Sequence, residues 1–150
     1  MRHSRRNRVT APATILSRLN TLLCRADTVT TATAVIATYR PRTGRLRWAR
    51  AGHPPPLLAD SHRVTCLPNP RGPLLGVFPA ASFTQHSHRL LPGHSVLFYT
   101  DGLIKRGALD EGIGLLAERI TGGHPAAVLD RLDFAAAGDD ACALLAQRIA

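Results

Sequence analysis

The stretch from Val96 to Gly102 places the strongest constraint on how this chain can fold. Its first four residues are β-branched, apolar or aromatic, and they lead directly into Thr100, Asp101 and Gly102. Such a run predicts a buried strand that ends in a tight turn. A carboxylate at the end of a buried strand must cap a backbone group, pair with a cation or bind a metal ion. A plain Asp-Gly turn is the ordinary alternative, and Asp101 alone does not distinguish between them.

A second acidic turn near the C-terminus makes the metal interpretation more specific. Asp139 and Asp140 follow a glycine and precede the apolar run 141–145, which is typical of another strand. One acidic turn thus ends a strand and the other begins one. Two such turns can bring hard oxygen ligands together. The sequence therefore predicts that Asp101 and Asp139 converge beside one sheet edge, and the functional assignment depends on that convergence.

Length and composition indicate a single globular domain. The chain has 150 residues, of which 45% are hydrophobic, and no apolar run is long enough to span a membrane. We interpret residues 1–10 as a disordered basic leader and 11–150 as the domain. The three cysteines are far apart and include no CxxC pair. They predict small buried residues in a reducing, cytoplasmic compartment.

The positive charge of the chain does not by itself indicate nucleic-acid binding. The formal net charge is +9, but the cations are mostly single, scattered arginines without interleaved aromatic residues. We therefore expect no nucleic-acid partner, although a basic nucleic-acid-binding module remains an open alternative. Acidic residues are concentrated after residue 100, where the two acidic turns lie.

The hydrophobic pattern predicts an α+β domain with hairpin-linked strands and grouped helices. Thr10 is the expected N-cap of a helix that ends near Ala26, with Leu16, Leu19 and Leu22 among its apolar stripe. The other expected elements are strands over 28–39, 45–50, 57–58, 64–67, 83–90 and 141–148, and helices over 112–120 and from 124 onward.

Four segments in this order resemble one known family. They are "GRLRWARAGHPPPLL" at 44–58, "GPLLGV" at 72–77, "LPGHSVLFYTDGLIKR" at 91–106 and "GDDACALLAQRI" at 138–149. Together they are similar to the PPM family of metal-dependent serine/threonine protein phosphatases. The likeness is to its bacterial branch, typified by the stage II sporulation protein E phosphatase and by phosphatases that regulate sigma factors. The resemblance covers roughly residues 11–149.

This resemblance implies an α–β–β–α sandwich, here lacking the N-terminal strands of the family. It implies two Mn²⁺ or Mg²⁺ ions and hydrolysis of phosphoserine or phosphothreonine on a regulatory protein of the anti-sigma-factor antagonist type. The implied metal ligands are Asp101 and Asp139. Gly102, Asp140 and His53 would lie near the ions or the substrate without binding metal.

The chain also departs from the family pattern. The family's opening Gly-Asp and Asp-Val-x-Gly-His-Gly motifs do not occur, Lys105 stands where Glu is usual, and His94 replaces an Asp. Because so few carboxylates cannot offset the charge of two divalent ions, we expect one ion at most and impaired hydrolysis. Two explanations are open. Either the recorded sequence begins too late, at an internal Met, or the chain is a catalytically inactive remnant that acts as a protein-binding module.

Overall fold

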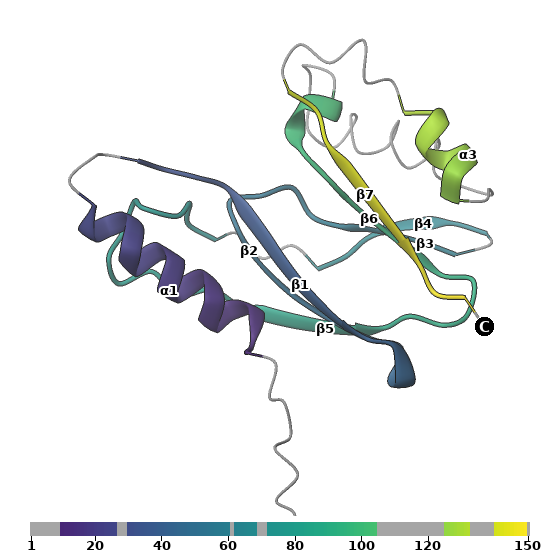
Figure 1. Ribbon diagram of the computed structural model, residues 1–150, viewed down its shortest axis with the longest axis horizontal. Coiled ribbons are helices and arrows are strands. Elements are labelled where there is room, and N and C mark those ends of the chain that lie inside the picture. The colour runs from purple at the N-terminus through teal and green to yellow at the C-terminus, as the bar shows by residue number, and fades with distance from the viewer. Residues whose placement is uncertain are drawn as a thin grey trace, which may run out of the picture. The chain divides into compact units, whose positions relative to one another are not determined.

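A computed structural model describes residues 10–26, 30–60, 62–68, 72–104, 125–132 and 140–149. Figure 1 labels the α-helices and strands among its elements. In order the elements are α1 (Pro12–Arg25), β1 (Ala34–Arg40), η1 (Pro41–Thr43), β2 (Arg45–Ala51), β3 (Leu57–Ala59), β4 (Val64–Cys66), β5 (Gln85–Arg89), β6 (Ser95–Tyr99), η2 (Asp101–Leu103), α3 (Pro125–Asp130) and β7 (Ala143–Gln147).

The described elements fall into two compact units, and each contains one antiparallel sheet. The first unit holds α1, β1, β2 and most of β5, with strand order β1-β2-β5. The second holds β3, β4, β6, α3 and β7, with strand order β4-β3-β6-β7. The predicted α+β class is therefore confirmed. No described helix has the length and apolar character that crossing a membrane requires.

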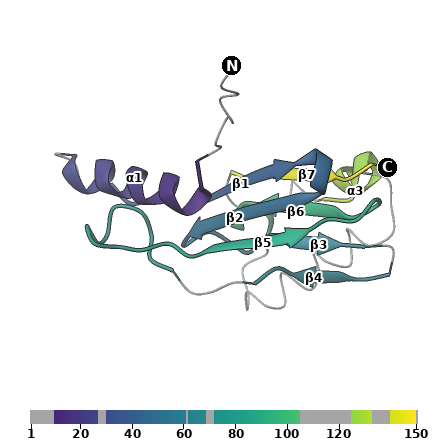
Figure 2. The same cartoon turned by 90° about the horizontal axis from the view of Figure 1, so that it is seen from below.

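The β1–β2 hairpin of the first unit forms as its sequence predicts. The two strands pair along their whole length, from Ala34 opposite Ala51 to Arg40 opposite Arg45. Figure 2 shows β1, β2 and β5 side by side, with α1 in the same unit. Leu46 and Trp48 are buried on one face, as strict alternation requires.

Helix α1 packs on the other face of this sheet, and two details of its prediction are wrong. Leu16 packs with Ala49, Ala51 and other buried residues. The N-cap is Ala11 rather than Thr10, and no side chain caps the helix. The proline at the first turn sets the helical start instead, because its fixed φ suits that position. The expected apolar stripe is also interrupted, because Leu19 and Leu22 are exposed.

A buried amide ties α1 to the loop before β5. Asn20 is 1% exposed, and its Nδ2 group donates to the Phe78 carbonyl at 2.9 Å. The Gly76 N–H donates to Asn20 Oδ1, also at 2.9 Å. A buried polar side chain needs such partners to offset its lost hydration. Asn20 therefore occupies a position on α1 that an apolar residue would fill in an ordinary packing helix.

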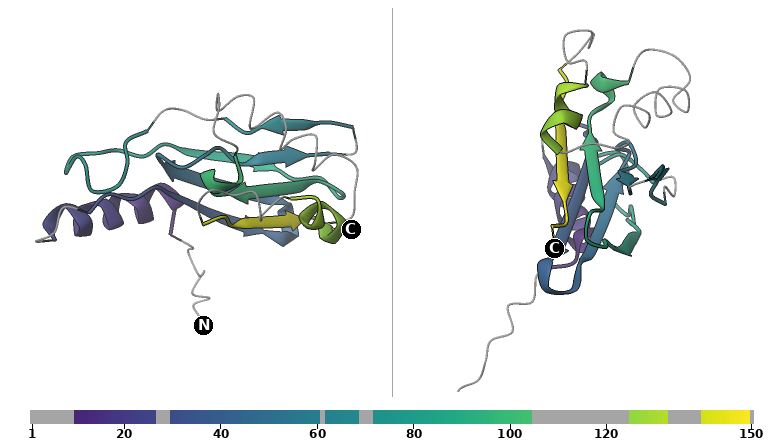
Figure 3. Two further views of the ribbon diagram at one scale, coloured as in Figure 1. Left: turned by 90° about the horizontal axis from the view of Figure 1, so that it is seen from above. Right: turned by 90° about the vertical axis from the view of Figure 1, so that its right-hand side faces the viewer.

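The sheet of the second unit is built around the predicted strand before Asp101. β6 pairs antiparallel with β3 on one side, Leu57 opposite Leu97, and with β7 on the other, Leu97 opposite Leu145. Figure 3 shows β6 and β7 side by side, with α3 near β7. One face of this sheet forms the core of the unit, and its buried members are Leu57, Ala59, Leu97, Tyr99, Val128 and Leu132.

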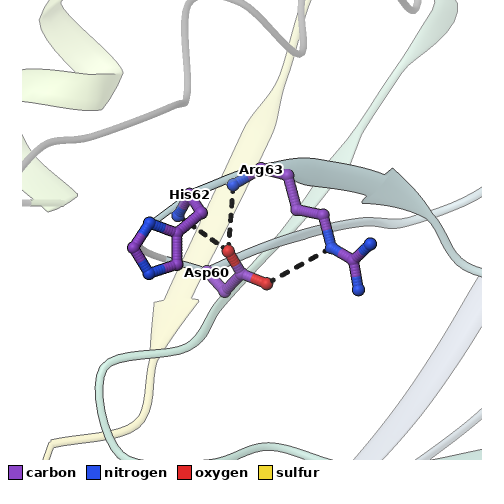
Figure 4. Close-up of polar contacts among 3 residues, drawn as sticks. All are labelled: Asp60, His62 and Arg63. Carbon is purple, nitrogen blue, oxygen red and sulfur yellow. Dashed lines mark hydrogen bonds and ion pairs between the residues drawn. The ribbon is translucent and has the colours of Figure 1, made fainter.

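The hairpin between β3 and β4 is closed by an aspartate. Asp60 Oδ1 accepts hydrogen bonds from the backbone N–H groups of His62, at 2.8 Å, and Arg63, at 2.9 Å (Figure 4). The Arg63 Nε atom lies 3.7 Å from Asp60 Oδ2. These bonds favour the ionised carboxylate, so the two backbone donors, followed by the positive charge of Arg63, lower the pKa of Asp60.

Some of the remaining predictions differ from the structure, and others fall outside the described residues. Cys66 and Cys142 are exposed rather than buried, because they lie at outward positions in or next to edge strands. Strand β1 begins at Ala34, later than the predicted residue 28. The leader, apart from Thr10, and the helix expected over 112–120 fall outside the described residues.

Candidate metal centre

The pairing of β6 with β7 fixes where the two acidic turns lie. The last strand pair is Tyr99 opposite Ala143. Beyond it the Thr100 N–H donates to the Cys142 carbonyl at 3.0 Å, and the Cys142 N–H donates to Thr100 Oγ1 at 2.8 Å. The register therefore continues past both strands. It brings the residue after Thr100 and the residues before Cys142 to the same end of the sheet.

Asp101 is thus the first residue beyond the paired part of β6. It begins the short 3-10 turn η2, in which the Ile104 N–H donates to the Asp101 carbonyl at 2.8 Å. The side chain of Asp101 is exposed, and Gly102 is half-buried. The backbone of Asp101 is therefore held by the turn while its carboxylate faces solvent, where a hydrated cation can reach it.

Asp140 lies at the same end of the sheet, two residues before Cys142, and it is also exposed. Asp139, which the sequence singles out as the second ligand, falls outside the described residues. Its role as a ligand stays a prediction. The described part of this acidic turn, represented by Asp140, lies at the end of the sheet at which Asp101 follows β6.

His53 precedes β3, the strand on the opposite side of β6 from β7. Because β3 is antiparallel to β6, the chain enters β3 where β6 ends, and Leu57 is opposite Leu97. His53 is half-buried and is separated from β3 by prolines, of which Pro55 and Pro56 are buried. Its role in shaping the loop near the site stays a prediction.

Thr100 is a residue of this site for which the sequence predicts no separate role. Its hydroxyl accepts the Cys142 N–H, so a side chain continues the β6–β7 ladder by one step. The bond joins residues that are 42 positions apart in the chain. A threonine directly before an Asp-Gly turn is the only local sign of this contact, and the sequence does not reveal its partner.

The donor groups at this end of the sheet suit a hard divalent cation. Mg²⁺ and Mn²⁺ favour carboxylate oxygens, and Asp101 and Asp140 present these at solvent-exposed positions. Within the described ranges, no three His, Cys, Asp or Glu side chains are grouped closely enough to hold a metal ion. The formal charge of two carboxylates matches that of one divalent ion, but not that of two. The described residues therefore fit part of a metal site.

The chain is similar in sequence to a known protein family and to a known protein. A model of the family described as stage II sporulation protein E (SpoIIE) matches residues 1–149. Protein IcfG from Synechocystis sp. is 33% identical over 60 residues, which are 40% of this chain and 10% of that protein. This chain therefore spans far less than the full length of that relative.

Two solved structures show the same fold over most of the chain. The structure of the RsbU and RsbW domains of Rv1364c from Mycobacterium tuberculosis has a TM-score of 0.70 and 27% identity, covering 94% of this chain and 43% of that one. The Mn-presoaked phosphatase domain of the cell fate determinant SpoIIE from Bacillus subtilis has a TM-score of 0.63 and 12% identity, covering 96% of this chain and 68% of that one. The second likeness concerns the fold alone.

Proposed function

The chain belongs to the stage II sporulation protein E family of PPM-type phosphatases, and we propose that it is a metal-dependent serine/threonine phosphatase domain. The observation that carries this proposal is the β6–β7 register, which brings Asp101 and Asp140 to one end of a sheet. The proposed substrate is a phosphoserine or phosphothreonine on a regulatory protein. The resemblance of the sequence favours a protein of the anti-sigma-factor antagonist type.

Within this proposal, Asp101 and Asp139 hold Mn²⁺ or Mg²⁺. Bound divalent ions of this kind offset negative charge on a phosphoryl group and make water a stronger nucleophile. The chain's own contribution is to fix the ligands. Thr100 ties the end of β6 to the start of β7, which holds Asp101 and the described residues before Cys142 at the same end of the sheet. Gly102 and Asp140 lie beside the ligands, and His53 shapes the loop before β3.

We further propose that these 150 residues alone hold one divalent ion at most and hydrolyse phosphate esters slowly. The support is electrostatic, because the carboxylates that the described residues bring to the end of β6 are too few to offset two divalent cations. The sequence also places Lys105 four residues after Asp101, which adds positive charge near the expected ion. Both features lower the affinity for a second ion, which family-type hydrolysis requires.

The test combines metal binding with turnover. Titration calorimetry with MnCl₂ on the 150-residue chain is expected to give a stoichiometry of about one. Asp139→Asn is expected to weaken binding at least about tenfold, whereas Asp140→Asn weakens it less, because a neighbouring carboxylate acts only through its charge. Equal effects of the two substitutions would reject the assignment of Asp139 as the ligand.

Hydrolysis is measured on p-nitrophenyl phosphate and on a phosphoserine peptide with Mn²⁺. Slow turnover that disappears in Asp101→Asn supports the phosphatase proposal. Turnover as fast as that of full-length relatives would refute the impairment. Metal-independent binding of an anti-sigma-factor antagonist, with no turnover and no Mn²⁺ binding, would favour the protein-binding module instead. The absence of three grouped ligands among the described residues is the observation that keeps this second function in view.

A further inference from the structure

Strand β7 lies at the edge of the second sheet. In the strand order β4-β3-β6-β7 it has β6 on one side, and no described strand on the other. One of its faces packs toward the core of the unit through Ala143 and Leu145. The other face exposes apolar surface, and Leu144 at its centre is 62% exposed. An apolar edge strand of this kind is a template for pairing with another strand.

The hydrogen bonds to β6 show which backbone groups of β7 point outward. The Arg148 N–H donates to the His94 carbonyl at 2.9 Å, and the Arg148 carbonyl accepts from the Gly93 N–H at 2.8 Å. Cys142 makes the corresponding bonds with Thr100 at the other end. Since successive residues of a strand point their backbone groups in opposite directions, the even-numbered residues face β6. The N–H and C=O groups of Ala143, Leu145 and Gln147 therefore point to the outer edge.

The charges at the two ends of β7 are opposite. Asp140 precedes the strand and Arg148 follows it, and Leu144 lies midway between them. Within β7 and its hydrogen-bonded continuation to Arg148, Leu144 and Arg148 share one face, because their numbers differ by a multiple of two. Asp140 lies three residues before the strand and shares this face if the chain stays extended there. The Arg148 Nη1 group donates to the Leu90 carbonyl at 2.5 Å, and its guanidinium has further N–H donors. The chain through β7 is thus acidic, apolar and basic in turn, with Asp140 and Leu144 exposed and Arg148 half-buried.

We propose that the outer edge of β7 pairs antiparallel with β7 of a second copy of this chain, about a two-fold axis at Leu144. The outward backbone groups of Ala143 then bond those of Leu145 in the second copy. Leu144 packs against its own counterpart, and Asp140 faces Arg148 of the second copy twice, once on each side of the axis. A two-fold interface requires a self-complementary surface, and β7 supplies it through its outward backbone groups and the order of charges at its two ends.

The charge pattern favours a second copy over an unrelated strand. An antiparallel partner must present a basic residue opposite Asp140 and an acidic residue opposite Arg148, with an apolar residue between them. Cross-strand pairs of opposite charge stabilise such pairing, and like pairs oppose it. β7 itself meets this requirement in the antiparallel register centred on Leu144. The proposal does not depend on metal binding or on phosphatase activity.

Disulfide trapping tests the register. In a chain with Cys24, Cys66 and Cys142 changed to serine, Leu144→Cys is expected to form a disulfide-linked dimer on mild oxidation. The two introduced thiols would be directly opposite at a non-hydrogen-bonded position, with Cα atoms roughly 4.5 Å apart. The matched control is Ala146→Cys in the same background. It lies on the same face, but its counterpart is offset by roughly 13 Å along the strand, so no disulfide is expected.

A second pair of cysteines, one introduced and one native, tests the same register. With Cys142 retained, Ala146→Cys is expected to link, because residue 146 lies opposite residue 142 of the second copy, while Cys142 alone does not. Non-reducing electrophoresis and intact mass identify the linked species. Equal linking at 144 and 146 in the cysteine-free background would mean random collision and would overturn the register. A monomeric Leu144→Cys variant whose introduced thiol resists maleimide would mean that the edge is covered within one chain, and would overturn the proposal.

Sedimentation velocity over a concentration series tests the ion pairs without any cross-link. Arg148→Asp sets two like-charged pairs across the axis and is expected to raise the dimer dissociation constant roughly tenfold. Adding Asp140→Arg to Arg148→Asp is expected to restore dimer formation, because the pairs are then reversed rather than lost. Circular dichroism confirms that each variant is folded. A wild-type chain that stays monomeric at all concentrations, or a double variant no better than Arg148→Asp, would refute the interface.

Discussion

The two compact units differ in how they use polar and charged side chains. In the described part of the first unit there are arginines but no aspartate or glutamate, and the fixed polar group is the neutral, buried amide of Asn20. The described carboxylates all belong to the second unit, namely Asp60, Asp101, Asp130 and Asp140. The first unit thus adds a buried neutral amide to its apolar core, whereas the second unit carries the described carboxylates that can bind a cation.

The largest difference is expected when the buried amide is removed. Asn20→Ala leaves the Phe78 carbonyl and the Gly76 N–H without their partner, and we expect a loss of about 3 kcal/mol in the free energy of unfolding. Urea denaturation measures it. The control is Thr21→Ala, an exposed position one residue along α1, which is expected to change stability by less than about 0.5 kcal/mol. A similar small effect at both positions would remove the contrast between the units.

The next prediction compares alanine substitution at two glycines. At one, an added Cβ would also clash with a neighbouring atom, and at the other only the backbone conformation opposes the change. Gly76 in the first unit has φ +82°, and an added Cβ would meet the Thr30 carbonyl oxygen. Gly93 in the second unit has φ +86° with nothing within 4 Å. Gly76→Ala is expected to cost about 2 kcal/mol and Gly93→Ala about 1 kcal/mol. Thermal unfolding compares them, and an equal cost would contradict the close packing of the loop against Thr30.

The third effect concerns metal rather than stability. Asp101→Asn is expected to weaken Mn²⁺ binding at least about tenfold, or about 1.4 kcal/mol, because a neutral amide oxygen replaces a carboxylate. Asp130→Asn is the matched control, since this exposed carboxylate of the same unit lies on α3. It is expected to leave binding unchanged. Equal losses would mean that affinity follows the net charge of the unit and not the end of the β6–β7 pair.

The smallest effect is expected at the Asp60 turn and depends on pH. Because the folded state lowers the pKa of Asp60, its contribution to stability is present above the unfolded pKa of about 4 and is lost as the pH falls through the folded pKa. Asp60→Asn is therefore expected to lower the melting temperature slightly at pH 7. The difference from wild type should shrink as the pH falls below about 4. A difference that stays constant over this range would show that the charge of Asp60 does not contribute.

Buried side chains were most predictable from the sequence in strands that have one buried face. Leu46 and Trp48 were predictable because alternation in β2 specifies which side chains face the core. The run before Asp101 was likewise predictable as β6. The buried face of α1 was harder to predict, because its apolar stripe suggested that Leu19 and Leu22 were buried, and both are exposed. Asn20, a polar residue, fills that role through partners more than fifty positions away. No local pattern reveals such a partner.

At the candidate site, too, features set by the local sequence pattern were predictable, whereas contacts between distant residues were not. The two acidic turns predicted that Asp101 and Asp139 converge, and the structure places Asp101 and the neighbouring Asp140 at one end of the sheet. Asp139 stays a predicted ligand. The tie between Thr100 and Cys142 was not predictable, because the hydroxyl finds its partner only when β6 and β7 have paired. Contacts that depend on register between distant strands come from the folded topology and not from neighbouring residues.

The separation of β6 and β7 along the chain has a consequence for folding. The contact of Thr100 with Cys142 closes a loop of 42 residues, and ordering such a loop carries an entropic cost. An ion held between the two acidic turns would favour the closed loop and would raise the protection of β7 amides against hydrogen exchange. The metal concentration would then set how often β7 detaches from β6. The occupancy of the metal site and the local unfolding of β7 would therefore change together.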